Sequence, residues 1–224
     1  MGSKNKLKRF NENEAFPNVV QPTRESLIEE SFAHKGNWHL FFNNSNPIVV
    51  ELGCGKGEYT LGLAQVFPKR NHIGVDIKGD RLWVGSGIAL RQGIQNAAFL
   101  RTQIQFLEHF FKKGEIDEIW ITFPDPRPKE KDEKRRLTAP RFLAIYQNLL
   151  KPDGWLRFKT DNTELFNYTL ELINQNRTSV KNLAFTHDLY DSDYVFEHYG
   201  IKTKYERKFA ALGEAIKYLK FQFQ

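Results

Sequence analysis

The chain of 224 residues has very little cysteine, no long hydrophobic run and no excess of acid over base. Its single cysteine, Cys54, excludes an internal disulfide framework and a cysteine-rich zinc site. No segment approaches the run of about 18 apolar residues that a transmembrane helix needs, and none near Met1 resembles a signal peptide. Lys6 stands where a myristoylation signal requires Ser or Thr. These absences predict a cytoplasmic protein with no membrane partner.

What is present is the composition of a folded, basic domain. Hydrophobic residues make up 40% of the chain, and its 19 Phe, 8 Tyr and 4 Trp argue against disorder. The net charge of +6 favours a polyanionic partner such as nucleic acid, although many basic proteins bind none. The length fits one α/β domain with room for a substantial core.

The first 46 residues are predicted to form a basic, irregular arm that precedes a domain spanning residues 47–224. Pro17, Pro22 and a run of Asn and Ser at residues 43–46 interrupt any long helix. Four cations come before the first acid: Lys4, Lys6, Lys8 and Arg9. The arm is either a frayed terminus or a segment that contacts phosphates, and its composition leaves both interpretations open.

From Pro47 onward, short apolar runs alternate with segments of helical spacing. Strands are expected at residues 48–52, 72–76, 97–100, 118–123 and 155–159. Helices are expected at residues 59–67, 78–92, 139–150 and 163–174, with another ending near 111. Two further strands are expected around residues 183–187 and 206–211. This alternation predicts a doubly wound, mostly parallel α/β sheet with helices on both faces.

A glycine-rich loop follows the first predicted strand. Gly53, Gly55 and Gly57 allow a tight turn and close approach of a ligand to the backbone, and a helix begins directly afterwards. A dinucleotide-binding fingerprint would need glycine three residues after Gly55, where this chain has Glu58. Glu51 opens the loop with a negative charge, which suits a cationic amino-acid ligand better than a pyrophosphate. The pattern is similar to the first motif of S-adenosylmethionine methyltransferases; the alternative is a tight turn without a ligand.

Two more residues are candidates for contacts with the same ligand. Asp76 ends the second predicted strand, where ribose hydroxyls bind in doubly wound nucleotide-binding folds. Its alternative role is to cap the helix that begins near Lys78. Gln103 follows the third strand, where an adenine contact is expected, and is equally well explained as a solvated loop residue. Cys54 is interpreted as a small packing residue.

The most distinctive segment spans residues 117–136. Its apolar strand ends at Phe123, and Pro124 and Pro126 then bracket Asp125 on a rigid extended turn. Six cations follow within a dozen residues: Arg127, Lys129, Lys131, Lys134, Arg135 and Arg136. Ligands bind at the carboxyl ends of strands in open α/β sheets, so Asp125 is expected beside the glycine loop. A positioned carboxylate beside a phosphate-attracting surface suggests chemistry on a nucleic-acid base; the alternatives are an ordinary turn residue and a solvated charged loop.

Four motifs together resemble the tRNA (guanine-N7)-methyltransferases, in order and at similar spacing between residues 47 and 213. They are Phe123-Pro-Asp-Pro126 with Lys129, Lys134-Arg-Arg-Leu-Thr138, Phe158-Lys-Thr-Asp161 and Thr203-Lys-Tyr-Glu206. The resemblance implies a Rossmann-like class I methyltransferase fold with a seven-stranded sheet and S-adenosylmethionine as methyl donor. It also implies methylation at N7 of a variable-loop guanine, position 46, in tRNA, by a monomer or homodimer that uses no metal.

The resemblance also carries residue roles onto this chain. The expected cofactor contacts are Glu51, Gly53, Gly55, Asp76, Gln103 and Asp125, and Asp125 is also the expected catalytic residue. The expected substrate contacts are Lys129, Asp161, Thr203, Lys204, Tyr205 and Glu206. Two residues depart from the family pattern: Gln103, where an acid or Asn is more familiar, and Arg127, where Trp is common. Without the resemblance, Asp161 would be interpreted as the N-cap of the helix that begins near Thr163.

The chemistry expected of such a site is a direct methyl transfer. Guanine N7 carries a free lone pair at neutral pH, so no general base is needed, and the protein supplies alignment and electrostatics. Asp125 is predicted to accept hydrogen bonds from the guanine N1 and N2 edge and to offset the growing positive charge. Lys129, Arg135 and Arg136 are predicted to engage phosphates. The alternatives are a methyltransferase acting on another RNA base or an exocyclic amine, and a non-catalytic tRNA-binding module; Glu58 disfavours a dehydrogenase.

Overall fold

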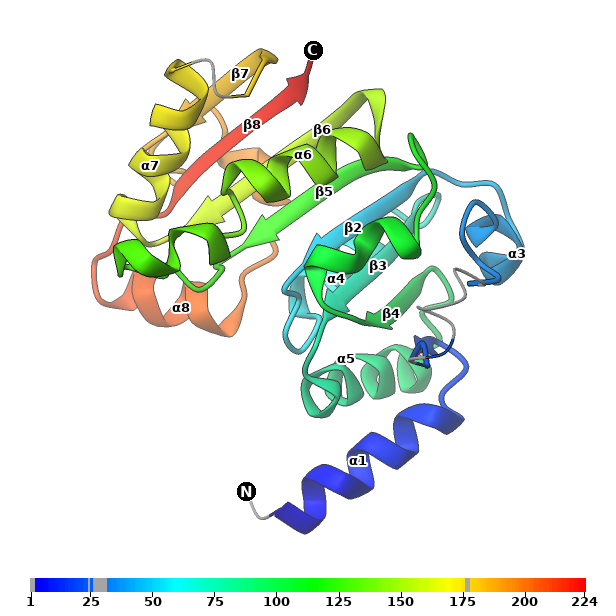
Figure 1. Ribbon diagram of the computed structural model, residues 1–224. Helices are drawn as coiled ribbons and strands as arrows, with labels where there is room; N and C mark the ends of the chain where they lie inside the picture. Colours follow the sequence, from blue (N-terminus) through cyan, green and yellow to red (C-terminus); the bar gives the residue numbers. More distant parts are fainter. Residues whose placement is uncertain (1–2, 24, 26–31, 176–177) are drawn as a thin grey trace.

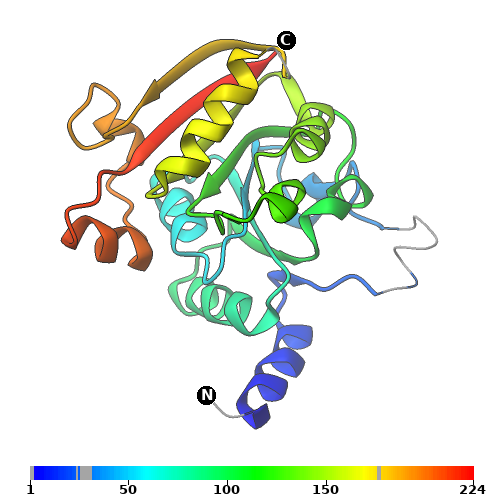
Figure 2. The same ribbon diagram turned by 60° about the vertical axis from the view of Figure 1, so that its left-hand side comes forward.

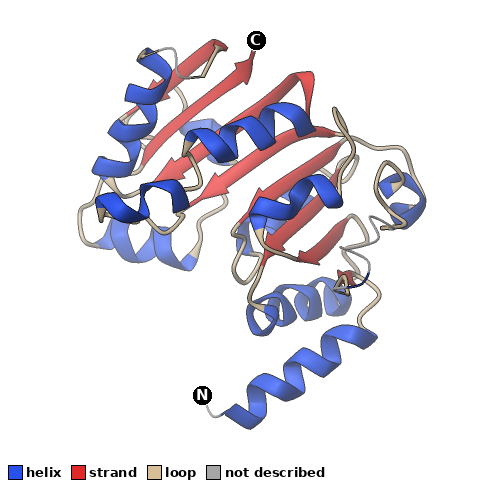
Figure 3. Ribbon diagram, viewed as in Figure 1, coloured by secondary structure: helices blue, strands red, loops and turns tan. Residues whose placement is uncertain are grey.

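The computed structural model describes residues 3–23, 25, 32–175 and 178–224 of the chain (Figure 1). Eight strands form one sheet in the order β1-β4-β3-β2-β5-β6-β8-β7 (Figures 1 and 3). The strands are β1 Val19–Val20, β2 Ile48–Leu52, β3 Asn71–Asp76, β4 Ala97–Arg101, β5 Ile116–Thr122, β6 Leu150–Thr160, β7 Val180–Thr186 and β8 Lys217–Phe223. In the order of the sheet, all neighbouring strands from β1 through β4, β3, β2 and β5 to β6 pair in parallel. Strand β8 lies antiparallel to both β6 and β7.

The predicted fold class, a doubly wound and mostly parallel α/β sheet, is confirmed. The sheet has eight strands where seven were expected, because the two-residue β1 pairs with the outer edge of β4. Val19 and Val20 pair with Phe99 and Leu100 and lie within the segment that was expected to be an irregular arm. Six of the remaining seven strands lie where the alternation predicts them, and β8 does not.

Helices cover both faces of this sheet. They are α1 Ser3–Ala15, α3 Trp38–Phe42, α4 Glu58–Val66, α5 Gly79–Gln92, α6 Pro140–Leu149, α7 Thr163–Asn174 and α8 Lys204–Ala211, with 3-10 turns η1 Ile104–His109, η2 Glu130–Arg135 and η3 Val195–His198. Side chains of α6 and α7 share one core with Ile119 and Ile121 of β5, on the face turned toward the viewer in Figure 1. Trp120 points to the other face and packs with Tyr59 of α4. Alternate residues of one strand therefore serve the two layers, as the pleat requires.

Two glycines bring α4, α5 and β4 together directly beneath the glycine-rich loop. Gly57 has a φ of 71°, and a Cβ there would lie 2.4 Å from the Phe99 ring. A Cβ on Gly85 of α5 would lie 2.5 Å from the carbonyl oxygen of Lys56. A larger side chain at either position would force the loop away from the sheet, so these glycines fix its height above the strand ends.

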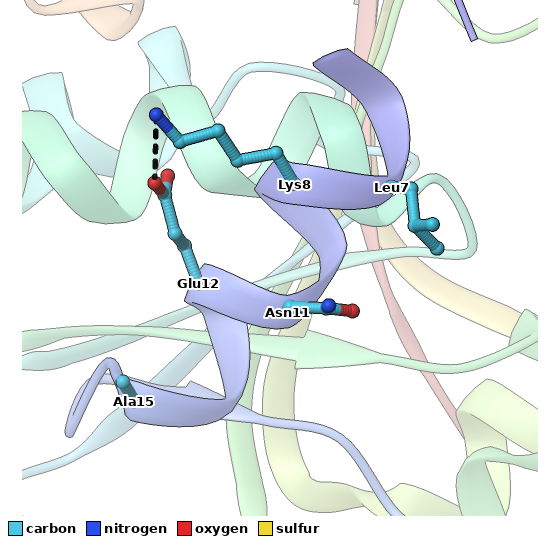
Figure 4. Close-up of a pocket in the computed structure, with 5 residues that line it drawn as sticks. All are labelled: Leu7, Lys8, Asn11, Glu12 and Ala15. Carbon is cyan, nitrogen blue, oxygen red and sulfur yellow. Dashed lines mark ion pairs between the residues drawn. The ribbon is translucent and has the colours of Figure 1, made fainter. Parts of the chain in front are cut away.

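Residues 3–15 form a helix, so the expectation of an irregular arm is wrong for this part of the chain. Buried Asn13 of α1 donates from Nδ2 to the carbonyl oxygen of Gly79 at 2.8 Å, and Arg9 stacks over Trp83 of α5. One face of α1 carries a shallow depression lined by Leu7, Lys8, Asn11, Glu12 and Ala15 (Figure 4). None of those residues belongs to the predicted site. The division into an arm and a domain at residue 47 stays a prediction.

The strand expected at residues 206–211 is wrong, because this segment belongs to helix α8. Thr203 accepts a hydrogen bond from the Glu206 N–H while the Glu206 carboxylate accepts one from the Thr203 N–H, which is the capping box that begins a helix. The missed strand is β8, in which every residue but Lys220 is buried. The helix expected before residue 111 is the 3-10 turn η1.

Candidate active site

The predicted site residues gather where the parallel strands end. Leu52 at the end of β2 pairs with Val75 on β3 and with Ile121 on β5, so the segments that follow these strands are neighbours. The arrowheads of β5 and β6 in Figure 1 point toward this edge, on the side where α8 lies. The edge therefore combines the glycine-rich loop, the turn around Asp125 and the Thr203 motif.

Glu51 is the buried acid at the base of the glycine-rich loop, with only 3% of its surface exposed. Its Oε2 accepts hydrogen bonds from the Thr60 N–H at 2.8 Å and the Thr60 hydroxyl at 2.5 Å, and its Oε1 accepts one from the Thr122 hydroxyl at 2.6 Å. Burial raises the pKa of Glu51 to about 7, although the threonine hydrogen bonds act in the opposite direction. A cation bound beside it would favour its charged form. Neither threonine was predicted, since nothing in their spacing marks them.

Asp76 joins the glycine-rich loop to the start of α5. Its Oδ2 accepts a hydrogen bond from the Gly55 N–H at 3.0 Å, and its Oδ1 accepts one from the Lys78 N–H at 2.8 Å. Lys78, not Asp76, occupies the N-cap position of α5, so the alternative role of Asp76 as that cap is wrong. The carboxylate therefore sets the shape of the loop as well as lining its edge.

The loop itself leaves its backbone open. Gly53 and Gly55 have φ values of 72° and 57°, in the left-handed region that glycine tolerates best. A Cβ placed on Gly55 would meet no atom within 4 Å among the described residues. Gln103, directly before η1, is exposed, and its Oε1 accepts a hydrogen bond from Gln105 Nε2 at 3.0 Å. Open backbone beside Glu51 and Asp76 is where a ligand can approach closely.

Asp125 lies at the rim, with 62% of its side chain exposed. Arg127 Nε lies 3.1 Å from Asp125 Oδ2, and the Arg127 N–H donates to Oδ1 at 3.3 Å. Phe123 and Arg127, on either side of the Pro-Asp-Pro sequence, both have a φ of 48°, which costs a non-glycine residue about 1–2 kcal/mol. The turn is therefore bent at both ends, and it presents the carboxylate to solvent beside a bound arginine.

The basic segment after the turn has two kinds of cation. Arg135 pairs with Asp132 at 3.1 Å, and Arg136 stacks 4.3 Å over the Tyr168 ring while donating from Nε to the Arg127 carbonyl oxygen. Three other cations are exposed and make no ion pair within the described residues: Lys129, Lys131 and Lys134. The arginines shape the segment, and the lysines remain available to an anionic partner.

Asp161 follows β6 at the same edge. Its carbonyl oxygen accepts a hydrogen bond from Lys217 Nζ at 2.8 Å, and across the described chain its carboxylate makes no hydrogen bond or ion pair. The N-cap of α7 is Asn162, whose side chain accepts from the Leu165 N–H at 2.7 Å, so the alternative role of Asp161 as that cap is wrong.

The motif from Thr203 to Glu206 is divided between the interior and the surface. Glu206 is completely buried; its Oε1 accepts hydrogen bonds from Lys159 Nζ at 2.8 Å and from the Tyr190 hydroxyl at 2.5 Å. Burial lowers the pKa of Lys159, while Glu206 acts to raise it. Lys204 and Tyr205 are exposed, Tyr205 by 58%. In this structure only the two central residues of the motif can meet a large partner directly.

Beyond these residues, the described part of the chain contains one thiol, that of Cys54. Cys54 is buried, and burial raises the pKa of its thiol, which makes it a poor nucleophile. Among the described residues, no group of three or more His, Cys, Asp or Glu side chains could hold a metal ion. None of the helices that the structure describes has the length and apolar character needed to cross a bilayer.

Residues 45–219 match a family model described as "Putative methyltransferase". The chain is 49% identical over 221 residues to the tRNA (guanine-N(7)-)-methyltransferase of Cytophaga hutchinsonii, covering 99% of this chain and 98% of the relative. It is also 49% identical over 226 residues to the enzyme of the same name from Christiangramia forsetii, covering 100% of both chains.

A solved structure provides a comparison of the fold alone. The 16S rRNA (adenine(1408)-N(1))-methyltransferase of Catenulisporales acidiphilia, solved as a mutant with its cosubstrate SAM, aligns with a TM-score of 0.56 at 14% identity. The alignment covers 84% of this chain and 90% of that one.

Proposed function

The chain belongs to the tRNA (guanine-N(7)-)-methyltransferase family and is an enzyme of that class, and from this we propose its reaction and its site. It transfers a methyl group from S-adenosylmethionine to N7 of guanine 46 in the variable loop of tRNA. The observation that carries the proposal is the meeting, at one sheet edge, of an open glycine-rich loop with buried acids and a rim carboxylate that precedes a segment with exposed lysines.

The donor side fits S-adenosylmethionine in shape and charge. The exposed backbone at Gly53 and Gly55 admits a ligand closely, and Glu51 supplies a negative charge for its ammonium group. The Asp76 carboxylate can accept hydrogen bonds from ribose hydroxyls, and the exposed amide of Gln103 can serve the adenine. When bound, the donor supplies an electrophilic methyl group on a positively charged sulfur.

The transfer needs no proton to be removed from guanine N7. A carbon–nitrogen bond forms at N7 as the carbon–sulfur bond breaks, and the positive charge moves from sulfur to the purine. Asp125 accepts hydrogen bonds from the N1–H and N2–H groups of guanine and offsets that charge as it grows. Arg127 must yield its place on the carboxylate to the base, which costs little because an exposed pair contributes only about 0–1 kcal/mol.

The tRNA side is assigned to the exposed groups around that carboxylate. Lys129 and its neighbours in the basic segment engage phosphates, and Asp161 assists in holding the base. Lys204 and Tyr205 face the partner, while Thr203 and Glu206 act through the helix that they cap. Phosphate contacts fix the register of a nucleic acid, and the base contacts select the guanine.

The test is to incubate the protein with methyl-labelled donor and an unmodified tRNA transcript, then to identify the modified nucleoside by mass spectrometry. We expect 7-methylguanosine from this transcript and none from a control transcript with adenosine at position 46. Methyl groups on an exocyclic amine would overturn the proposed chemistry. Equal methylation of both transcripts would overturn only the proposed position, and no donor binding in calorimetry would favour the non-catalytic module.

A further inference from the structure

Glu58, the first residue of α4, connects the glycine-rich loop to helix α8, although 146 residues separate it from Lys204. Its Oε2 accepts a hydrogen bond from the Lys204 N–H at 2.9 Å, and its Oε1 lies 3.4 Å from the Arg207 guanidinium. Figures 1 and 2 show α8 on the side of the molecule toward which the loop before α4 extends. The carboxylate thus reaches from the donor side of the site to the tRNA side.

The Lys204 N–H, which donates to Glu58, has no acceptor within α8. The first N–H groups of a helix have no carbonyl acceptor in the helix itself. In α8 the capping box satisfies the N–H groups of Thr203 and Glu206, and Glu58 accepts from Lys204, which lies between them. A negative charge at the N-terminus of α8 also interacts favourably with the positive end of the helix dipole.

Three contacts together hold α8 on α4 and β6. Ile201, just before the helix, packs so closely on Gly62 of α4 that a Cβ there would lie 2.7 Å from its side chain. Lys159 holds Glu206 from beneath with a buried ion pair at 2.8 Å. These contacts fix the depth of the helix, and Glu58 fixes the end that carries the exposed Lys204 and Tyr205.

We propose that Glu58 is a positioning residue for tRNA, although it follows the glycine-rich loop directly. Its carboxylate orients the first turn of α8, so that Lys204 and Tyr205 meet the tRNA in the arrangement that the reaction needs. This inference rests on the proposed function and refines its tRNA side. The Glu58 carboxylate contacts α8, so the affinity of the protein for the donor should not depend on Glu58.

The alternative is a surface ion pair with no consequence for the reaction. The Glu58 and Arg207 side chains are 38% and 59% exposed, and exposed pairs contribute only about 0–1 kcal/mol to stability. Simple electrostatics further predicts that removing an acid beside a polyanion improves binding. The positioning role predicts the opposite, a higher KM for tRNA when Glu58 is removed. The two interpretations therefore differ in the sign of the change in KM.

The experiment compares E58A, E58D and E58Q with the wild type and with E171A, which removes an exposed acid from α7. We measure kcat and KM for tRNA at saturating donor, the donor Kd by calorimetry without tRNA, and Tm. We expect E58A to raise KM for tRNA about fivefold to tenfold, the size of one ordinary hydrogen bond, with kcat and donor Kd within about twofold. E58D, whose carboxylate is too short to reach Lys204, should behave like E58A. E58Q should recover most of the loss, because its amide oxygen still accepts the Lys204 N–H.

Several outcomes would overturn the proposal. An E58A KM for tRNA equal to or below that of E171A would show that the contact has no positioning role. A donor Kd weakened about tenfold would assign Glu58 to the donor instead. A loss of activity in E58A and E58Q that follows a lowered Tm would make the role purely structural. If the wild type itself forms no 7-methylguanosine, the proposed function fails, whereas this proposal fails only on an active wild type.

Discussion

The two acids proposed to face the reaction, Glu51 and Asp125, have opposite surroundings. Glu51 is 3% exposed and accepts three hydrogen bonds from Thr60 and Thr122. Asp125 has 62% of its side chain exposed, and among the described residues its partner is Arg127. The proposed donor side already has its contacts in place in the free protein, whereas the proposed tRNA side has its charged groups exposed to water.

This contrast follows from the size of the two proposed substrates. A small donor can be enclosed by a loop and three strand ends, so its contacts can be buried and fixed in advance. A folded tRNA cannot enter a protein interior, so its contacts have to lie on exposed segments such as η2 and the outer side of α8. Beneath this proposed tRNA side, Lys159 and Glu206 form a completely buried ion pair that anchors α8.

The largest effect should come from Asp125. D125A should lower kcat at least about 100-fold, because the proposed carboxylate offsets charge that grows only in the transition state, and donor Kd should change less than threefold. The matched control is D153A, which also removes an exposed acid paired with one cation, Lys181 at 3.2 Å. Turnover in D125A close to that of D153A would show that the exposed acid has no part in the chemistry.

Next in size is the buried pair under α8. E206Q leaves the Lys159 ammonium without its counter-charge in the interior, so we expect a loss of about 3 kcal/mol in the free energy of unfolding by urea denaturation. E58A, which disrupts only the exposed contact with the same helix, should lose less than about 1 kcal/mol. Equal losses would show that the buried Lys159–Glu206 pair contributes no more to stability than the exposed Glu58 contact.

The donor side should respond to pH through Glu51. Because the pKa of Glu51 is raised to about 7, donor affinity should rise up to about tenfold per pH unit below that value and level off above it. In the free protein the sign is reversed: the stability that the protonated acid contributes below pH 4.5 is lost as the pH rises through 7. Calorimetry and Tm measured from pH 5 to 9 test both, and E51Q should flatten both curves. An unchanged pH profile in E51Q would assign the titration to another group.

The smallest effect is expected for a single lysine on the tRNA side. K129A should raise KM for tRNA about threefold at low salt and reduce the slope of log KM against log salt by about one, as expected for one lost phosphate contact. K113A, which removes an exposed lysine before β5, should leave the slope unchanged. Identical slopes in the two variants would remove Lys129 from the tRNA surface.

The sequence predicted the parallel half of the sheet better than the antiparallel half. β2 and α7 begin and end at the predicted residues, because apolar periodicity and flanking turn residues agree there. The segment at residues 206–211 was predicted as a strand, although the capping box beginning at Thr203 was legible in the sequence. The helix α1 was missed because its stability comes from contacts with α5, such as that of Asn13, which no local pattern contains.

The family and the meeting of the candidate site residues at one sheet edge were predicted, but the contacts of those residues were not. Thr122 was not singled out, yet its hydroxyl holds Glu51 across a strand pair. The burial of Glu206 against Lys159 required the fold to bring residues 47 positions apart together. The individual roles of the predicted residues stay predictions until the experiments above are done.

The left-handed backbone at Arg127 has one more consequence. It lets a single residue grasp both oxygens of the Asp125 carboxylate, one with its main-chain N–H and the other with its guanidinium. The main-chain N–H is present in every residue except proline, so a substitution of Arg127 can remove the counter-charge and keep the hydrogen bond that orients the carboxylate. A designer can therefore change the charge beside Asp125 at position 127 itself, without moving to another site in the chain.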